Sequence, residues 1–116
     1  MAMTLVCDSA DRMHELCFKV LVSWRERLVG LLGTDAGADP VTLSPCWSVH
    51  TFFMRYAIDV AFVARDGRVV ASRRCVPPGR LLAGPGACWA LERPARRGWW
   101  PQKGLVLRLT TREGEG

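Results

Sequence analysis

The sequence has no hydrophobic run close to the ~20 residues that a membrane-spanning helix needs. Its first residues also lack the basic start and the long apolar segment of a secretory signal peptide, and Asp8 and Asp11 stand there instead. These absences predict a cytoplasmic protein without a membrane span. With 116 residues, 49% hydrophobic and 23% charged, the chain has the length and composition of one globular domain, which excludes a disordered chain, collagen or a coiled coil.

The cysteines form no C-x-x-C pair and are odd in number, which excludes complete disulfide pairing. They are Cys7, Cys17, Cys46, Cys75 and Cys88. Their wide spacing is typical neither of a zinc site of four cysteines nor of a secreted disulfide scaffold, so we expect reduced thiols. The sequence also lacks a P-loop and a G-x-G-x-x-G motif, and we predict no cofactor.

Lysine is scarce, since 14 of the 16 basic residues are arginine, and the net charge is +5. Such a balance can attract an anionic partner, but an arginine-rich soluble surface is the favoured explanation. In the turn-rich segment 93–103, basic residues stand around Trp99 and Trp100. Bases of single-stranded nucleic acid stack on such side chains, but no RNP-type strand motif is present, so nucleic acid is not an expected partner.

Short segments rich in apolar residues, often alternating with polar ones, dominate the chain and predict strands. The expected strands are residues 17–22, 41–43, 47–54, 57–64, 69–76, 87–92 and 105–111. Asp66-Gly67 predicts a hairpin between two of them, because the turn that it favours needs positive φ at both central residues.

One helix is expected over residues 24–32, where Ser23 and Glu26 form a capping box and Gly33 suits the left-handed C-terminal cap. The whole pattern predicts a mainly β fold, an antiparallel β-sandwich or a distorted barrel with this one short α-helix. The domain is expected to span residues 17–112, between an N-terminal extension (1–16) and a frayed tail (113–116).

The segment 45–59 concentrates residue types that can carry chemistry. A metal site built from Cys46, His50 and Asp59 is the first interpretation. Four residues of an extended strand span ~13 Å, which is too far for Cys46 and His50 to share one ion, so no metal is expected.

The second interpretation is nucleophilic catalysis, with Cys46 or Ser48 as the nucleophile and His50 as the base. Asp59 or Glu92 would then orient the imidazole. Side chains one strand repeat apart stand wider than a direct hydrogen bond, and no G-x-S-x-G elbow occurs, so this chemistry is the weaker hypothesis.

The third interpretation is a binding face that mixes aromatic, soft and cationic groups. It comprises His50, Phe52, Met54, Arg55 and Tyr56. For any one of these residues alone, a structural role is the simpler explanation. Asp59 differs, because a carboxylate among apolar strand residues needs a partner, and we expect Arg55 or a backbone N–H to supply it.

Four blocks of sequence also occur in a characteristic order: RERLVGLL (25–32), LSPCWSVHTFFMRYAIDVAF (43–62), DGRVV (66–70) and WALE (89–92). In this order they resemble the DUF192 family, also called UPF0127, although many members have proline where Ala57 stands. The resemblance implies a compact, jelly-roll-like, mainly β domain with one short helix and no established activity.

By motif position, the resemblance marks six residues: Arg27, His50, Met54, Arg55, Asp59 and Glu92. It implies that the two carboxylates are partners of Arg27 or Arg55 in a polar network beneath a groove.

Residues and resemblance together predict an uncharacterised DUF192-type domain that is a non-catalytic module for a small ligand or a partner protein. The predicted ligand-binding residues are His50, Phe52, Met54, Arg55, Asp59 and Glu92. The alternative is a small thiol- or histidine-dependent enzyme, a hydrolase or transferase, that uses Cys46 or His50 with Asp59. Neither the identity of the ligand nor the oligomeric state follows from these patterns.

Overall fold

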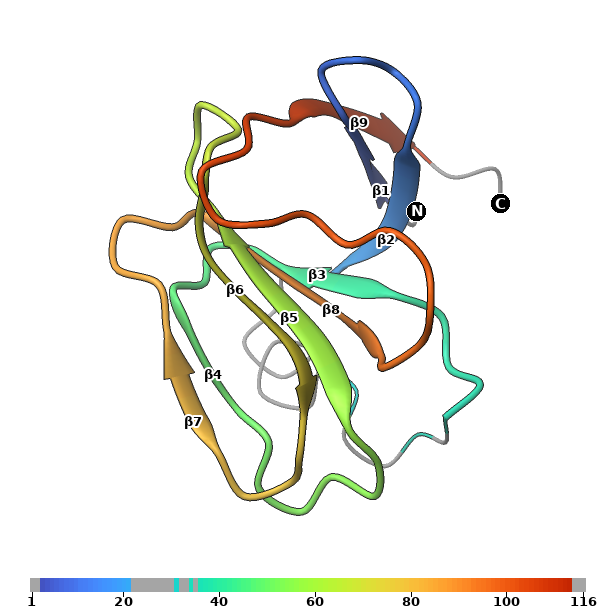
Figure 1. Cartoon of the computed structure of the whole chain (residues 1–116), viewed down its shortest axis with the longest axis vertical. Helices are drawn as coiled ribbons and strands as arrows, with labels where there is room; N and C mark the ends of the chain where they lie inside the picture. The colour runs from blue at the N-terminus through green and yellow to red at the C-terminus, as the bar shows by residue number, and fades with distance from the viewer. Residues whose placement is uncertain (1–2, 22–30, 32–33, 35, 114–116) are drawn as a thin grey trace.

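Nine strands make up the regular structure of the chain in a computed structural model, which describes residues 3–21, 31, 34 and 36–113. They are β1 (Met3–Asp8), β2 (Glu15–Leu21), β3 (Val41–Leu43), β4 (Ser48–His50), β5 (Ile58–Val63), β6 (Val69–Val76), β7 (Leu81–Ala83), β8 (Trp89–Pro94) and β9 (Arg108–Glu113), as Figure 1 shows. No helix occurs in these ranges, and the predicted mainly β class is confirmed.

The strands form one large and one small sheet. The large sheet has the order β6-β5-β8-β3-β2-β1-β9, and its neighbours are antiparallel except for the parallel pair β2 and β3. The small sheet is an antiparallel ribbon of β4 and β7. The large sheet is not a closed barrel, but its two edges approach each other at one end, where Arg68 and Val106 form an isolated bridge.

Hydrophobic side chains pack on both faces of the large sheet. On one face, Trp100 lies edge-on against Phe18, with 6.0 Å between the ring centroids, so the segment between β8 and β9 covers this core. Figure 1 shows that segment crossing in front of the large sheet. On the other face, Phe62 packs with Val49 of β4 and Leu82 of β7, so the ribbon covers the second core.

The hairpin predicted at Asp66-Gly67 is confirmed between β5 and β6. Gly67 has φ of +93°, and the Asp66 carboxylate accepts a hydrogen bond from the backbone N–H of Arg68 at 3.0 Å. The predicted strands at 41–43 and 69–76 have the same bounds in the structure.

Three expectations about the elements need correction. Residues 3–8 are not part of an extension but form β1 between β2 and β9, where its central residues are buried by both neighbours. The strand expected over 47–54 ends at His50, because the backbone of Thr51 is bonded to the loop after β6 and Phe53 adopts a φ of +68°. Glu113 belongs to β9 rather than to a frayed tail.

The helix predicted over 24–32 lies outside the described residues, apart from Leu31, which is in a turn. The described part of the chain holds no helical segment with the length and hydrophobicity that crossing a bilayer would require.

Candidate functional site

Asp59 is a buried carboxylate on β5, the strand next to the edge strand β6, and lies directly opposite Arg93 in the pairing of β5 and β8. Its Oδ2 atom accepts a hydrogen bond from Arg93 Nε at 2.8 Å, and both side chains are 2% exposed. Burial of a charge is costly unless an opposite charge and hydrogen bonds compensate it, and this pair meets that condition for Asp59. The sequence predicted a partner for Asp59, but Arg55 is exposed and Arg93 takes the role.

A β-bulge in β6 supplies the second half of the Asp59 environment. The register between β5 and β6 shifts between Ile58 and Val60, and Cys75 adopts a φ of +53°. The backbone N–H of Cys75 therefore donates to Asp59 Oδ1 at 3.0 Å, which supplies the backbone partner that the sequence predicts for Asp59. Bulges commonly redirect groups toward a functional site in this manner.

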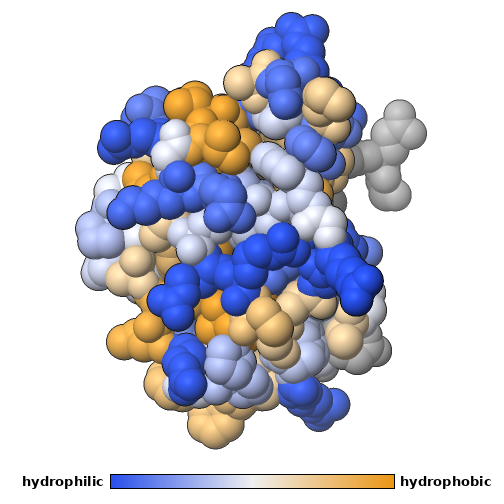
Figure 2. All heavy atoms as spheres, in the orientation of Figure 1, coloured by the Kyte–Doolittle hydropathy of each residue, from blue (hydrophilic) through white to orange (hydrophobic). Residues whose placement is uncertain are grey.

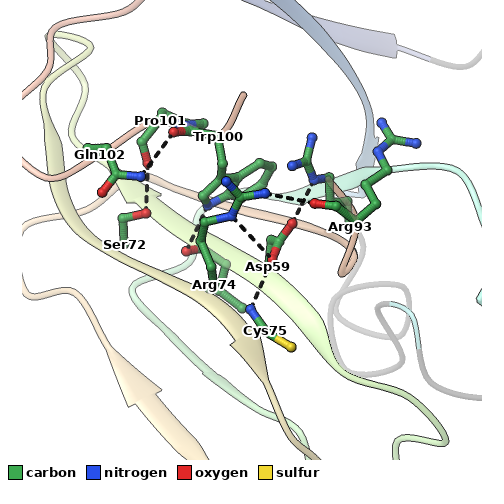
Figure 3. A network of polar contacts seen from close by, with 10 residues as sticks. Asp59, Ser72, Arg74, Cys75, Arg93, Trp100, Pro101 and Gln102 are labelled. Atoms are coloured by element: carbon green, nitrogen blue, oxygen red, sulfur yellow. Dashed lines mark hydrogen bonds and ion pairs between the residues drawn. The ribbon is translucent and has the colours of Figure 1, made fainter. Parts of the chain in front are cut away.

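Arg74 lies at the solvent side of the same carboxylate. Its Nε atom is 3.9 Å from Asp59 Oδ1, and its Nη2 atom donates to the carbonyl oxygen of Arg96 at 2.7 Å. Figure 3 shows the Asp59 carboxylate between the side chains of Arg93 and Arg74. This contact joins β6 to the loop that follows β8, so the loop is held beside Asp59.

Trp100 fixes the buried side of this arrangement. The guanidinium carbon of Arg93 is 4.5 Å from the centroid of the Trp100 ring, which is a cation–π contact. The indole Nε1 donates to the carbonyl oxygen of Val60 at 3.3 Å (Figure 3). One terminal nitrogen of Arg93, Nη2, is buried and has no hydrogen-bond partner in the described structure.

Above Asp59 lies an open groove with a volume of about 470 Å³, which we call the arginine groove. It is lined by Asp59, Arg74, Cys75, Ala95, Arg96, Arg97 and Gly98. Three of these residues are exposed arginines, whereas the one carboxylate among them is already matched by Arg93. Figure 2 shows a hydrophilic band across this side of the molecule. The arginine groove therefore carries an excess of positive charge.

The loop that forms one wall of the arginine groove offers backbone donors as well. Gly98 has φ of +110°, and within the described part of the chain the N–H groups of Arg96, Arg97 and Gly98 meet no hydrogen-bond acceptor. Successive free N–H groups beside guanidinium groups are a common anion-binding arrangement.

The six residues predicted to bind a ligand do not share one place. Asp59 lines the arginine groove, and Glu92 is buried on the opposite face of the sheet, in register with Val41 and Val60. His50 is exposed on β4 and stacks on Phe52, with 5.5 Å between ring centroids.

The other two predicted residues lie in the connection between β4 and β5. Met54 is half-buried against the second core, and Arg55 is exposed in the turn before β5. The structure therefore brings His50, Phe52 and Met54 into one neighbourhood and leaves Asp59 and Glu92 apart from them and from each other.

Glu92 lies opposite Val41 and Val60 of the neighbouring strands. Within the described part of the chain, no ion pair and no side-chain hydrogen bond involves its carboxylate. Removal of this side chain from water raises the pKa of Glu92 from 4.5 to about 7. The DUF192 resemblance implied that both carboxylates pair with Arg27 or Arg55. Asp59 pairs with Arg93 and Arg74 instead, Arg55 is exposed, and Arg27 lies outside the described residues.

The groups proposed for catalysis have other contacts. The Cys46 thiol donates to the carbonyl oxygen of Ser48 at 3.0 Å, and Asp59 is bonded to Arg93. None of the five cysteines, all of which lie in the described ranges, forms a disulfide, and no three metal-ligating side chains gather in those ranges.

Sequence reasoning missed the walls of the arginine groove. The sequence favours an ordinary soluble surface for the basic residues of the segment 93–103, which include Arg96 and Arg97, and the bulge at Cys75 has no sequence signature. The adjacent arginine pairs, 73–74 and 96–97, were the one local signal that could have indicated it.

Comparisons with known proteins place the fold but not the activity. No protein-family model matches the chain, and no curated protein matches it. The structure is similar to that of a proposed transcription regulator from Sinorhizobium meliloti 1021, with a TM-score of 0.74 and 18% identity over 94% of each chain. It is also similar to a protein of unknown function from Novosphingobium aromaticivorans DSM 12444, with a TM-score of 0.66 and 17% identity over 81% of this chain and 74% of that chain. At these identities the likeness shows a shared fold.

Proposed function

We propose that this protein is a non-catalytic binding module whose ligand is a small anion held in the arginine groove. The observation that carries the proposal is the excess of positive charge around a groove whose one carboxylate is already neutralised from below by Arg93. A groove lined by charges of one sign concentrates ions of the opposite sign. The convergence of the arginines with three unbonded N–H groups favours an anionic occupant.

The geometry suits an oxyanion such as a phosphate or a carboxylate. A guanidinium group presents parallel N–H donors that match two oxygen atoms of one anion. Arg96 and Arg97 are exposed, and Arg74 is held in place by Asp59 and the Arg96 carbonyl, so one donor is preorganised and two can adjust. Preorganised donors reduce the entropy that binding costs.

Three observations favour binding over catalysis by Cys46 or His50. The Cys46 thiol is directed to the Ser48 carbonyl, and the His50 ring is exposed and stacked on Phe52. Asp59, the carboxylate that would orient the imidazole, is buried with Arg93.

A DUF192-type, jelly-roll-like domain remains part of this proposal. The support is that Asp59, which belongs to the longest of the four resembling blocks, is the residue on which the groove is built.

Isothermal titration with inorganic phosphate and with citrate tests the proposal. We expect saturable binding to at least one of them, together with amide shifts at Ala95 and Gly98 in NMR spectra. Replacement Arg96→Gln with Arg97→Gln should weaken the binding by about tenfold or more, because charge-assisted hydrogen bonds are lost. The matched control is Arg65→Gln, an exposed arginine outside the groove lining. Flat titrations with both anions, or equal losses in the control, would refute the proposal.

A further inference from the structure

A second groove lies on the other side of β6, between this strand and β7. It has a volume of about 330 Å³ and is lined by Phe62, Ala71, Ser72, Arg73, Leu81, Leu82, Ala83 and Lys103. We call it the edge groove. Neighbouring residues of a strand point to opposite faces, which is why Arg74 lines the arginine groove and Arg73 lines the edge groove.

The residues that line the edge groove show that the backbones of β6 and β7 border it. Three consecutive residues of β6 and all three residues of β7 contribute to the lining. Side chains alone would contribute every second residue of a strand, since they alternate between the two faces. Both backbones therefore border the groove.

Both bordering strands are at the edge of their sheets. β6 pairs with β5 on one side, and β7 pairs with β4 on one side. The chain before β9 covers the start of β6, where the N–H of Val69 donates to the Leu105 carbonyl at 2.8 Å. At Ser72 the side-chain hydroxyl donates to the Pro101 carbonyl oxygen at 2.7 Å, but no described strand pairs with the main chain of β6 on this side. An unpaired strand edge of this kind is a template for another extended chain.

The chemistry of the edge groove restricts what such a chain can be. Arg73 and Lys103 are exposed cations, and no acidic side chain is among its lining residues. Phe62 and Leu82 supply apolar surface, and Leu81 is 74% exposed beside them. A matching chain alternates acidic and apolar side chains.

We propose that the edge groove binds an acidic peptide in extended conformation, which adds to β6 as a further strand. The main-chain hydrogen bonds of strand addition supply affinity, and the alternating side chains supply specificity. A second copy of this chain is a poorer occupant, because pairing two β6 strands brings Arg73 and Arg74 of both copies together. This inference does not depend on the anion proposed for the arginine groove.

The test uses the full chain and three synthetic octapeptides, one alternating glutamate with valine, one alternating lysine with valine, and one acidic peptide with N-methylated alternate amides. Fluorescence anisotropy should show binding of the first peptide and about tenfold weaker binding of the other two, because they lack the charge and the hydrogen bonds respectively. Hydrogen exchange should show new protection of backbone amides within residues 71–74.

Variants assign the binding to this groove. Arg73→Glu should weaken the binding of the acidic peptide by about tenfold and leave phosphate binding in the arginine groove intact. Arg96→Gln with Arg97→Gln should weaken phosphate binding and leave the binding of the acidic peptide intact. Arg65→Glu is the control for net charge.

The inference would be overturned by equal binding of the N-methylated peptide, by no binding of the acidic peptide, or by a concentration-dependent dimer that Arg73→Glu abolishes. Tighter binding of a single-stranded oligonucleotide than of the acidic peptide would also overturn it.

Discussion

Two buried carboxylates, one on each face of the same sheet, differ in how their charge is accommodated. Asp59 accepts hydrogen bonds from Arg93 and from the Cys75 N–H, and Arg74 lies within ion-pair range. Glu92 has no such partner in the described structure, and its pKa is raised to about 7 by loss of solvation. Asp59 holds the groups around the arginine groove through its charge, whereas the folded protein is most stable when Glu92 is protonated.

Replacement Asp59→Ala should destabilise the protein by about 3 to 5 kcal/mol, because it leaves the buried Arg93 guanidinium without its counter-charge. Urea denaturation of this variant and of Asp39→Ala, an exposed aspartate, measures the difference. The double variant Asp59→Ala, Arg93→Ala should lose less than the sum of the two single losses. Additive losses would show that the pair does not act as a unit.

Glu92 makes stability depend on pH. The pKa of Glu92 is near 4.5 in the unfolded chain and about 7 in the folded protein. Protonated Glu92 therefore makes its full contribution to the free energy of unfolding below pH 4.5, and this contribution is lost as the pH rises through 7. Glu92→Gln should therefore match the wild type at pH 4.5 and exceed it by about 3 kcal/mol at pH 8. Urea unfolding at both values measures this, with exposed Glu15→Gln as the control. An equal difference at both pH values would contradict a protonated Glu92.

At the scale of elements, β6 separates two grooves of different character. Its bulge at Cys75 turns one N–H toward Asp59, and its two adjacent arginines face opposite sides of the sheet. The ribbon of β4 and β7 then forms the far wall of the edge groove. The position of that ribbon depends on the corner at which β4 ends.

Thr51 forms this corner. Its buried hydroxyl donates to the Pro77 carbonyl and accepts from the Arg80 N–H, both at 2.8 Å. Thr51→Val keeps the volume but leaves both backbone groups unpaired, which should cost about 2 kcal/mol. Hydrogen exchange of the Arg80 amide should also accelerate. Thr110→Val, on the exposed side of β9, is the control, and an equal cost in both would mean that the corner does not hold the ribbon.

Local sequence patterns predicted those elements that depend on only a few neighbouring residues. The hairpin at Asp66-Gly67 and the strand at 69–76 follow from turn chemistry and alternation, which act over a few residues. β1 was missed because its burial comes from β2 and β9, which bracket it in space but not in sequence. The partner of Asp59 was missed for the same reason. Arg93 lies 34 positions away in the sequence and meets Asp59 only because β5 pairs with β8, which no local pattern predicts.

At the scale of the whole molecule, the two edges of the large sheet approach each other. The strands concerned, β6 and β9, stand at opposite ends of the sheet. The approach is made by main-chain hydrogen bonds, including Leu107 N–H to the Gly67 carbonyl at 2.8 Å, next to the Arg68–Val106 bridge. We call this contact the seam. It makes the sheet curve around the core that contains Trp100 and Leu107.

Gly67 allows the seam to form, since a Cβ atom there would lie 2.1 Å from the carbonyl oxygen of Leu107. Gly67→Ala should therefore cost about 2 to 4 kcal/mol, the sum of the positive-φ penalty and the displacement of the seam. Gly79→Ala is a matched control, because Gly79 has a similar φ of +87° and no atom within 4 Å of the added Cβ, so it should cost only about 1 to 2 kcal/mol. Thermal unfolding of both variants, with hydrogen exchange of the Leu107 amide, separates the two contributions. If the two variants lose equal stability and the Leu107 amide stays protected, the seam does not contribute to holding the sheet in its curved form.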